Sequence, residues 1–271
     1  MRERSLVMFT LSAQTSAGAY MILAVFQMFG PDELLSFPVI AVLGLLLGFG
    51  LLGAFFHLGS PGRALRVLSN LRSSWLSREI LAVSLFGCLL LILGILVLSG
   101  LQPPSLLTVA AAMSAFALVL VMGRAYMLSV VPVWNTPLTN LSFFASSILL
   151  GGGLVLLFYS SLDSFSKYVF TVVVLMELAL LVELTLSILR YWLPVRRNRI
   201  EILRRYGDIH HPGVVPASVR TVHLGLMLIF GVILGIGSAN FLLLWISFLL
   251  AFIGQAAGRV LFYEAGLGQR R

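Results

Sequence analysis

Residues 80–123, ILAVSLFGCLLLILGILVLSGLQPPSLLTVAAAMSAFALVLVMG, contain no charged side chain. A helix that crosses the hydrocarbon core of a membrane needs about 20 apolar residues, so this stretch is too long for one crossing. It is interrupted at 100–104, GLQPP, where the prolines lack a backbone N–H and favour a turn. The stretch therefore predicts two membrane-spanning helices joined by a short turn.

The rest of the chain is equally apolar. Hydrophobic residues make up 59% of the 271 positions, and only 10% are charged, against about 25% in an average soluble domain. Because so few charged side chains cannot cover the surface of a soluble fold, we predict an all-α polytopic membrane protein with eight transmembrane helices in a bundle. The chain is expected to form a single membrane-anchor domain over 1–271, with spans near 6–29, 36–57, 79–100, 105–127, 140–160, 167–190, 220–238 and 241–263. The first apolar run continues unbroken to Phe29, which favours a retained helix over a cleaved signal peptide.

The positive charges lie between the apolar spans and gather on one side of the predicted membrane. The net charge is +8, which in a soluble protein would suggest nucleic acid; here the basic residues set topology instead, and no nucleic-acid partner is expected. With eight spans, both termini and three loops share one face. That face carries Arg2, Arg4, Arg63, Arg66, Arg72, Arg78, Arg124, Arg190, Arg196, Arg197, Arg199, Arg204, Arg205, Arg220, Arg270 and Arg271. The opposite face has Lys167 as its basic residue. The positive-inside rule therefore places both termini in the cytoplasm of a cell-membrane protein that is surrounded by lipid.

Redox ligands are scarce. The single cysteine, Cys88, excludes a disulfide framework and an iron–sulfur cluster held by this chain alone. The four histidines lie near one interface, whereas transmembrane haem needs histidines on facing helices. No metal-ligand spacing and no phosphate-binding loop occur. We therefore expect no haem and no metal in this chain.

A histidine and a carboxylate stand at the same predicted membrane edge. His57 closes the second span, and Glu79 opens the third, after a loop that contains Arg63. Taken singly, Glu79 fits a carboxylate favoured by a helix dipole, and His57 fits an interfacial histidine bonded to a loop carbonyl. Together they form a pair of bases that could accept protons from a lipid-soluble donor.

Further polar residues converge on that edge. The dipeptide Gly-Arg ends at Arg63, Arg124 and Arg259, each time at the arginine-rich side, and Tyr126 follows Arg124. Arg259 lies one to two turns inside the interface, where a guanidinium should snorkel or pair. Topogenic arginines would explain these positions equally well.

The sixth span carries two carboxylates, Glu177 and Glu183. A charge at mid-bilayer costs about 2.5–3.5 kcal/mol on insertion scales, so such a residue faces protein or water and is a functional candidate. Six residues of helix rotate by about 240°, so the two side chains should not share a face. The alternative is a pair of protonated carboxyls bonded within the bundle.

Several stretches resemble the membrane anchor subunits of dimethyl sulfoxide reductase, the DmsC family. The resemblance extends from the first helix to the last and is most specific from His57 to Glu79. The matching stretches are FTLSAQ at 9–14, HLGSP at 57–61 with Arg63-Ala64, LSREI at 76–80, RAY at 124–126, Val131-Pro132, WNTP at 134–137, Gly258-Arg259 and Phe262-Tyr263.

This resemblance implies a haem-free, eight-helix subunit that oxidises menaquinol. It also implies two partners, a four-cluster iron–sulfur subunit and a molybdopterin catalytic subunit, which the chain would hold to the membrane. The quinol-linked histidine and glutamate of the family match His57 and Glu79. As further quinol-pocket candidates we take the residues Gln14, Arg63, Arg124, Tyr126 and Arg259. Family members often carry an acidic residue where this chain has Gln255, which puts a proton-transfer role there in doubt.

Two other functions fit parts of the sequence. A secondary transporter would have broken helices in matched halves and a site at the membrane midplane, whereas the polar residues here gather at one edge. A structural anchor would lack a quinol site. No loop is long enough for a soluble catalytic domain, so a redox role would consist of binding the quinol and placing it near a partner's cluster.

Overall fold

The computed structural model describes residues 2–29, 34–57, 70–129, 131, 134–162, 165–189, 217–237 and 240–267. Within these ranges the chain forms long helices and no strand. The helices are α1 (Arg2–Phe29), α2 (Phe37–His57), α4 (Trp75–Leu98), α5 (Ser105–Tyr126), α6 (Pro137–Tyr159), α7 (Ser166–Ser187), α9 (Ala217–Gly237) and α10 (Phe241–Leu267). All eight are long and apolar enough to cross a membrane, which confirms the predicted all-α, eight-helix architecture.

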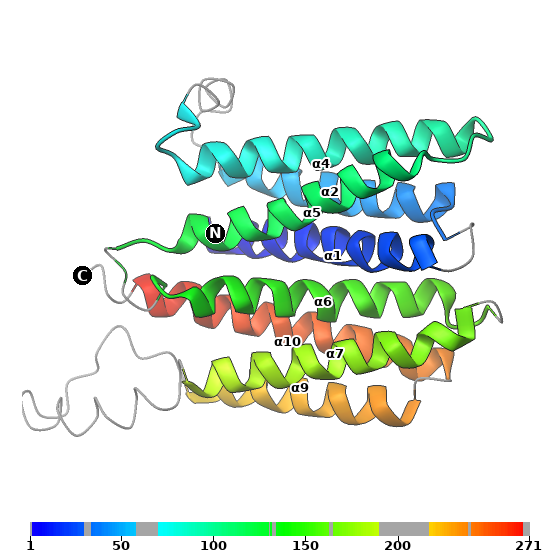
Figure 1. Ribbon diagram of the computed structural model, residues 1–271. Coiled ribbons are helices and arrows are strands. Elements are labelled where there is room, and N and C mark those ends of the chain that lie inside the picture. The colour runs from blue at the N-terminus through cyan, green and yellow to red at the C-terminus, as the bar shows by residue number, and fades with distance from the viewer. Residues whose placement is uncertain are drawn as a thin grey trace, which may run out of the picture.

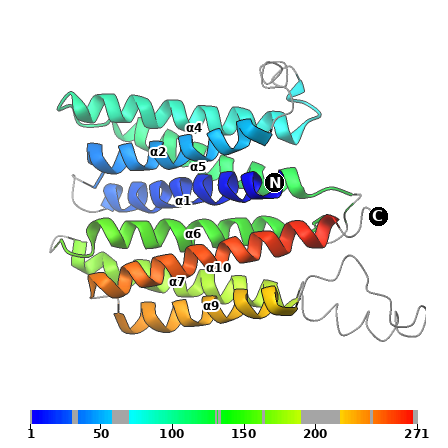
Figure 2. The same cartoon turned by 180° about the vertical axis from the view of Figure 1, so that it is seen from behind.

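The helices form two four-helix halves that follow each other in the sequence. In the first half α1 packs on α2 and α5, and α4 packs on the same two helices; in the second half α6 and α9 each pack on α7 and α10. The two halves meet mainly along α1 and α6, which lie side by side at the middle of the molecule (Figures 1 and 2). Burial follows this layout: 78% of the α1 span and 72% of the α6 span are buried, against 22–44% in the other six.

Glycines let α1 and α6 approach closely. A Cβ built on Gly18 would lie 1.9 Å from the Ser147 carbonyl oxygen, and one on Gly151 would lie 2.3 Å from the Ala19 nitrogen. In lipid, helix association depends on such close packing because the hydrophobic effect no longer distinguishes helix from lipid tail. The crossing of α1 and α6 therefore fixes how the two halves sit together.

The turn predicted at 100–104 is present and has a defined structure. Gly100 has a φ of +73°, a left-handed conformation that favours glycine. The Gly100 N–H bonds to the Val97 carbonyl, and the Leu101 N–H bonds to the Leu96 carbonyl, which is the Schellman ending of a helix. Ser105 then starts α5 directly after the two prolines.

Helix α4 begins earlier than the sequence suggested. The apolar pattern predicts a start near residue 79, but the first residue of the helix is Trp75, because the Ser74 side chain caps it by accepting a hydrogen bond from the Ser77 N–H. Glu79 therefore lies beyond the first turn of α4, and the helix dipole does not explain its position.

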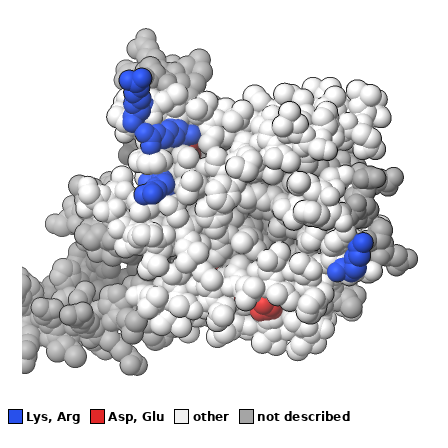
Figure 3. All heavy atoms as spheres, viewed as in Figure 1, with Lys and Arg blue, Asp and Glu red and all other residues white. Residues whose placement is uncertain are grey.

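The outer surface is suited to lipid. Large apolar side chains project from the helices, among them Leu106 at 82% and Ile236 at 80% exposure. Figure 3 shows one face of the molecule, on which the basic side chains lie toward the two ends and the broad belt between them is uncharged apart from an acidic side chain. A belt with so little charge matches the hydrocarbon core of a bilayer.

Candidate functional site

Arg259 occupies the place where the two halves meet, near the end of the bundle that holds both termini. Its side chain is only 3% exposed. The Nη2 atom donates to Gln14 Oε1 at 3.1 Å and to Ser146 Oγ at 3.0 Å. The guanidinium also stacks over the Phe143 ring, with Cζ 3.8 Å from the ring centroid. A guanidinium inside an apolar bundle is stable only with such partners, and a desolvated cation–π contact contributes about 2 kcal/mol.

Gln14 connects the first half to this arginine. Its side chain is fully buried on α1, and its Nε2 donates to the Phe143 carbonyl of α6 at 3.1 Å. Because the amide oxygen accepts from Arg259, one side chain joins α1, α6 and α10. The structure thus brings together Gln14 and Arg259, two predicted pocket residues that are 245 positions apart in the sequence.

Two further predicted residues, Glu79 and Tyr126, lie within electrostatic range of each other, and Arg259 lies within range of Tyr126. The Tyr263 hydroxyl donates to the Tyr126 hydroxyl at 3.0 Å. Glu79 lies close enough to both tyrosines for electrostatic interaction, as does Arg259. Glu79 is 6% exposed, and its Oε1 atom is buried without a hydrogen-bond partner. This carboxyl is therefore a strong candidate for contact with a ligand, because an unsatisfied buried oxygen is costly.

Aromatic rings pack around the two tyrosines. The Tyr126 ring lies 5.5–6.0 Å from the rings of Trp134, Phe143, Phe262 and Tyr263. Trp134 stacks on Phe262 at 5.1 Å and donates its indole N–H to the Phe262 carbonyl at 2.8 Å. Flat apolar surfaces next to a carboxyl, a guanidinium and phenols suit a planar aromatic ligand with polar oxygens.

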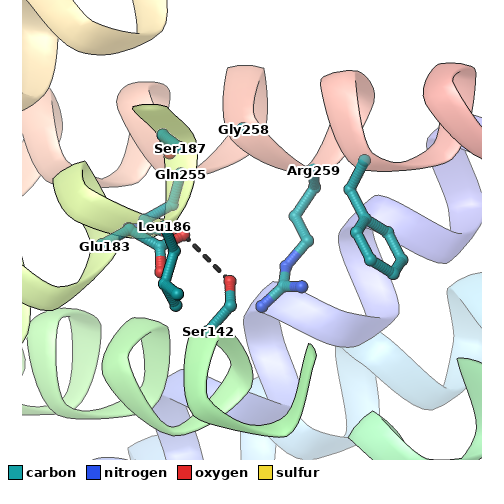
Figure 4. A pocket seen from close by; sticks show the side chains of 8 residues that line it. Ser142, Glu183, Leu186, Ser187, Gln255, Gly258 and Arg259 are labelled. Carbon is teal, nitrogen blue, oxygen red and sulfur yellow. Dashed lines mark hydrogen bonds between the residues drawn. The ribbon is translucent and has the colours of Figure 1, made fainter. Parts of the chain in front are cut away.

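A small cavity lies on the α7 side of Arg259 (Figure 4). About 10 Å³ of it is open to the centre of a water molecule. The Ser142 hydroxyl donates to Glu183 Oε1 at 3.1 Å, and the other oxygen of Glu183 is buried without a hydrogen-bond partner. The lining residues are Ser142, Glu183, Leu186, Ser187, Gln255, Gly258, Arg259 and Phe262.

The other candidates are placed differently. His57 is the last residue of α2, at the same end of the bundle as Glu79, but its side chain and all of Arg63 lie outside the described residues. Arg124 is exposed, and its Cζ lies 5.9 Å from the Trp75 ring centroid on α4. The side chain of Arg124 thus packs against the surface at Trp75 and is not joined to the Gln14–Arg259 bond.

The two carboxylates of α7 face different ways, as the helical rotation predicted. Glu183 bonds to Ser142 of α6, whereas the Glu177 carboxyl lies beside Gly231 of α9. Glu177 is half-buried.

Sequence reasoning did not select Ser142, Ser146 or His223. Ser146 connects Arg259 to Gln255, whose Oε1 accepts from the Ser146 hydroxyl at 2.8 Å. His223 is 1% exposed, and its Nε2 atom lies 2.9 Å from the Oγ atom of Ser187. The spacing of Ser142 and Ser146, one turn apart in an apolar span, was a signal that could have indicated a polar face. His223 was expected near the interface from its position in the span, and the structure adds that its side chain is buried between helices.

Known proteins match the chain over all or part of its length. The family described as DMSO reductase anchor subunit (DmsC) matches residues 1–267. The chain is 34% identical over 161 residues to the C chain of an anaerobic dimethyl sulfoxide reductase of Haemophilus influenzae, which is 57% of each protein. It is 30% identical to two anaerobic dimethyl sulfoxide reductase chains of Escherichia coli, to the YnfH chain over 55% of each protein and to the C chain over 56%. These matches thus span little more than half the length of the curated relatives.

Proposed function

Because the chain belongs to the family of DMSO reductase anchor subunits, we propose that it binds menaquinol at the arginine-rich end of the bundle and oxidises it. The quinol site would lie between Glu79, the Tyr126–Tyr263 pair and Arg259, with His57 nearby at the end of α2. The electrons would pass to an iron–sulfur partner subunit, because only one cysteine is present and it cannot hold a cluster alone.

The observation that carries this proposal is the buried Glu79 carboxyl. Its Oε1 atom has no hydrogen-bond partner, and the carboxyl lies within electrostatic range of Tyr126 and Tyr263, whose rings pack together. Quinol oxidation releases two protons, and a base must lie within hydrogen-bond reach of each quinol hydroxyl. A carboxylate oxygen that accepts from a quinol hydroxyl would satisfy the orphaned atom and take the proton in one contact.

The residues around Glu79 would have different roles in binding the quinol and accepting its protons. His57 is the better first proton acceptor because imidazole titrates near neutral pH, and Glu79 would orient it or pass the proton on. The aromatic rings would hold the quinol head group, and Arg259 would favour electron density on its oxygens. These roles need an apolar wall and a polar end, which this site combines.

Two substitutions test the quinol site. His57→Ala and Glu79→Gln should each abolish quinol-driven reductase activity in membranes, while a reduced dye that feeds the partner subunits directly should still support turnover. Glu177→Gln is the matched control, because Glu177 is a membrane carboxyl on the other half of the molecule and lies beside α9. Unchanged quinol oxidation in both test variants, with normal assembly, would leave only the role of a structural anchor.

Partner binding is a separate part of the proposal. The family relationship supports a complex with a four-cluster iron–sulfur subunit and a molybdopterin catalytic subunit. We expect the purified chain to show no haem absorbance and no iron, and to copurify with a cluster-bearing subunit when its neighbouring genes are expressed with it. A Soret band from the isolated chain would contradict this.

We also propose that both termini face the cytoplasm of a cell-membrane protein. The sequence pattern predicts that sixteen arginines, spread over several segments, lie on the side of the termini. An exported acidic partner that docks on these arginines would require the opposite orientation. Reporter fusions at Arg271 and within 194–218 should lack alkaline phosphatase activity, and a fusion near Asp163 should have it; the reverse pattern would overturn the orientation.

A further inference from the structure

Glu183 is a second buried carboxyl at the same end of the bundle, and the quinol site proposed above does not use it. It is 6% exposed on α7. Its Oε1 atom accepts from the Ser142 hydroxyl at 3.1 Å, whereas its Oε2 atom is buried without a hydrogen-bond partner. A carboxyl in an apolar bundle with one satisfied and one unsatisfied oxygen is poised to bind a proton or a water molecule at the second oxygen.

The cavity beside Glu183 suits a single water molecule. About 10 Å³ is open to a water centre, close to the minimum that one water molecule requires. A buried water also needs two to four polar partners. The walls supply them through Ser142, Glu183, Gln255 and Arg259.

This cavity adjoins the proposed quinol site. Arg259 and Phe262 line both: Phe262 packs edge-on against Tyr126 at 5.7 Å, and Arg259 lies close enough to Tyr126 and Tyr263 for electrostatic interaction. Arg259 also donates to Ser146, which bonds to Gln255 in the cavity wall. Arg259 and Phe262 therefore stand between the Tyr126 side and the Glu183 side and contact both.

On its other side the cavity is bordered by Ser187 of α7, which contacts His223 of α9. Ser187 lines the cavity one turn after Glu183 and is the last residue of α7. Its Oγ lies 2.9 Å from His223 Nε2, and His223 Nδ1 lies 2.7 Å from the Gly254 carbonyl. Since a carbonyl only accepts, Nδ1 carries the hydrogen in the neutral ring and Nε2 accepts from Ser187. A proton that arrives at the Ser187 oxygen is thus passed to His223.

The charged groups around Glu183 agree with such a route. Arg259 faces the cavity from α10, and His223 reaches its edge from α9 through Ser187. Ser142 faces Glu183 from α6. Glu177, which is on α7 like Glu183, lies beside Gly231 of α9 instead. Arg220 lies one turn from His223 toward the end of α9 that holds the arginine-rich face.

We propose that the cavity between α6, α7 and α10 holds water and that Glu183 relays one of the two quinol protons to the arginine-rich surface. This inference rests on the proposed quinol site. As the quinol becomes quinone, two electrons leave for the iron–sulfur partner, one proton goes to the His57–Glu79 pair, and the other crosses the cavity water to Glu183 Oε2. From there it moves through Ser187 to His223, which is 1% exposed and is the last group of the relay inside the bundle, one turn from Arg220 on α9. Release of the proton from His223 to the aqueous phase and return of Glu183 to its carboxylate form complete the step.

Glu183→Gln in the assembled complex is the principal test. With a menaquinol analogue as donor, we expect kcat to fall about tenfold, less than the roughly 10²–10⁴-fold that loss of a direct acid–base group costs. KM should be unchanged, the solvent isotope effect in D₂O should increase, and the pH dependence of kcat should change. Glu177→Gln, a carboxamide substitution on the same helix, is the matched control and should behave as the wild type.

A second variant and a spectroscopic measurement complete the test. Ser142→Ala removes the donor to Glu183 Oε1 and should lower kcat about threefold, in line with the loss of one hydrogen bond; it carries the test if Glu183→Gln does not assemble. Infrared difference spectra of quinol oxidation in the wild type should contain a carboxyl band that shifts in D₂O. The same band should be absent from the spectra of Glu183→Gln.

The outcomes separate this inference from the quinol site itself. Wild-type kcat, pH profile and isotope effect in the Glu183 variant would overturn the relay, as would a loss of activity that appears only as a raised KM. If only Ser142→Ala assembles, a wild-type kcat and a wild-type isotope effect in that variant would also overturn the relay. Full activity of His57→Ala and Glu79→Gln would instead overturn the quinol site.

Discussion

Glu79 and Glu183 are both 6% exposed, and both lie four residues from a helix end at the same side of the bundle, one in each half. Their neighbours differ. Glu79 lies within electrostatic range of two phenols and its Oε1 atom has no hydrogen-bond partner, whereas Glu183 accepts from Ser142 and borders a cavity of water size. The same burial therefore supports two roles: the first carboxyl has the surroundings of a ligand contact, and the second those of a proton relay. Arg259 stands between them.

The comparison depends first on how the two halves are joined. Gly151→Ala would place a Cβ 2.3 Å from the Ala19 backbone nitrogen, so α1 and α6 would have to separate. The cost should exceed the about 1–3 kcal/mol of ordinary overpacking, because backbone atoms cannot rotate away. We expect little folded subunit in the membrane and no quinol activity, measured by membrane yield and thermal unfolding.

Gly48→Ala is the control for this experiment. It is also a glycine within a helix, but nothing lies within 4 Å of the added Cβ. Normal yield is expected there, with a gain in stability of about 0.5–1 kcal/mol. Normal yield of Gly151→Ala would show that the α1–α6 crossing is looser than its geometry implies.

Arg259→Gln removes the guanidinium that lies between the Glu79 site and the Glu183 cavity. The change leaves Gln14 and Ser146 without their charged donor, and each lost bond to a charged group costs about 1.5–3 kcal/mol. Quinol-driven turnover should fall by roughly 10²–10³-fold, as when a preorganised electrostatic contact is lost. Dye-driven turnover in the same membranes should be retained; its loss would mean that Arg259 acts in assembly.

Tyr263→Phe distinguishes the two sides of Arg259. It removes the hydroxyl that donates to Tyr126 and leaves the Glu183 cavity intact. Loss of one hydrogen bond, about 0.5–1.5 kcal/mol, should raise KM for the quinol about two- to tenfold. The solvent isotope effect should stay at its wild-type value. An increased isotope effect would place Tyr263 on the proton route.

Arg124→Gln should have the smallest effect. Its side chain is exposed and lies over Trp75, outside the Gln14–Arg259 contacts. Exposed charge contacts contribute about 0–1 kcal/mol, so the change in quinol-driven kcat/KM should be modest. A loss as large as that of Arg259→Gln would bring Arg124 into the quinol pocket, as the sequence motif suggested.

The sequence selected several of the polar residues that the structure brings together, but it did not give their arrangement. Gln14, Glu79, Tyr126 and Arg259 were selected from motif positions, and the structure groups them through one hydrogen bond and a set of electrostatic contacts. His223 was placed near the interface from its position close to the start of a span. That position says nothing about the direction of its side chain. It is buried because α9 turns that face toward Ser187 and Gly254.

The sequence by itself determined the eight long apolar helices and the turn at Gly100, and it predicts the side that holds the arginines. These follow from local chemistry: lipid requires a long apolar helix, proline and glycine interrupt it, and arginine stays at the interface. Only the tertiary structure decided which polar side chains meet. Gln14 reaches Arg259 because Gly18 and Gly151 let α1 and α6 touch, and Glu183 reaches Ser142 because α7 packs on α6. In lipid such pairings depend on how the surfaces of neighbouring helices fit together, and the hydropathy pattern of the sequence does not predict that fit.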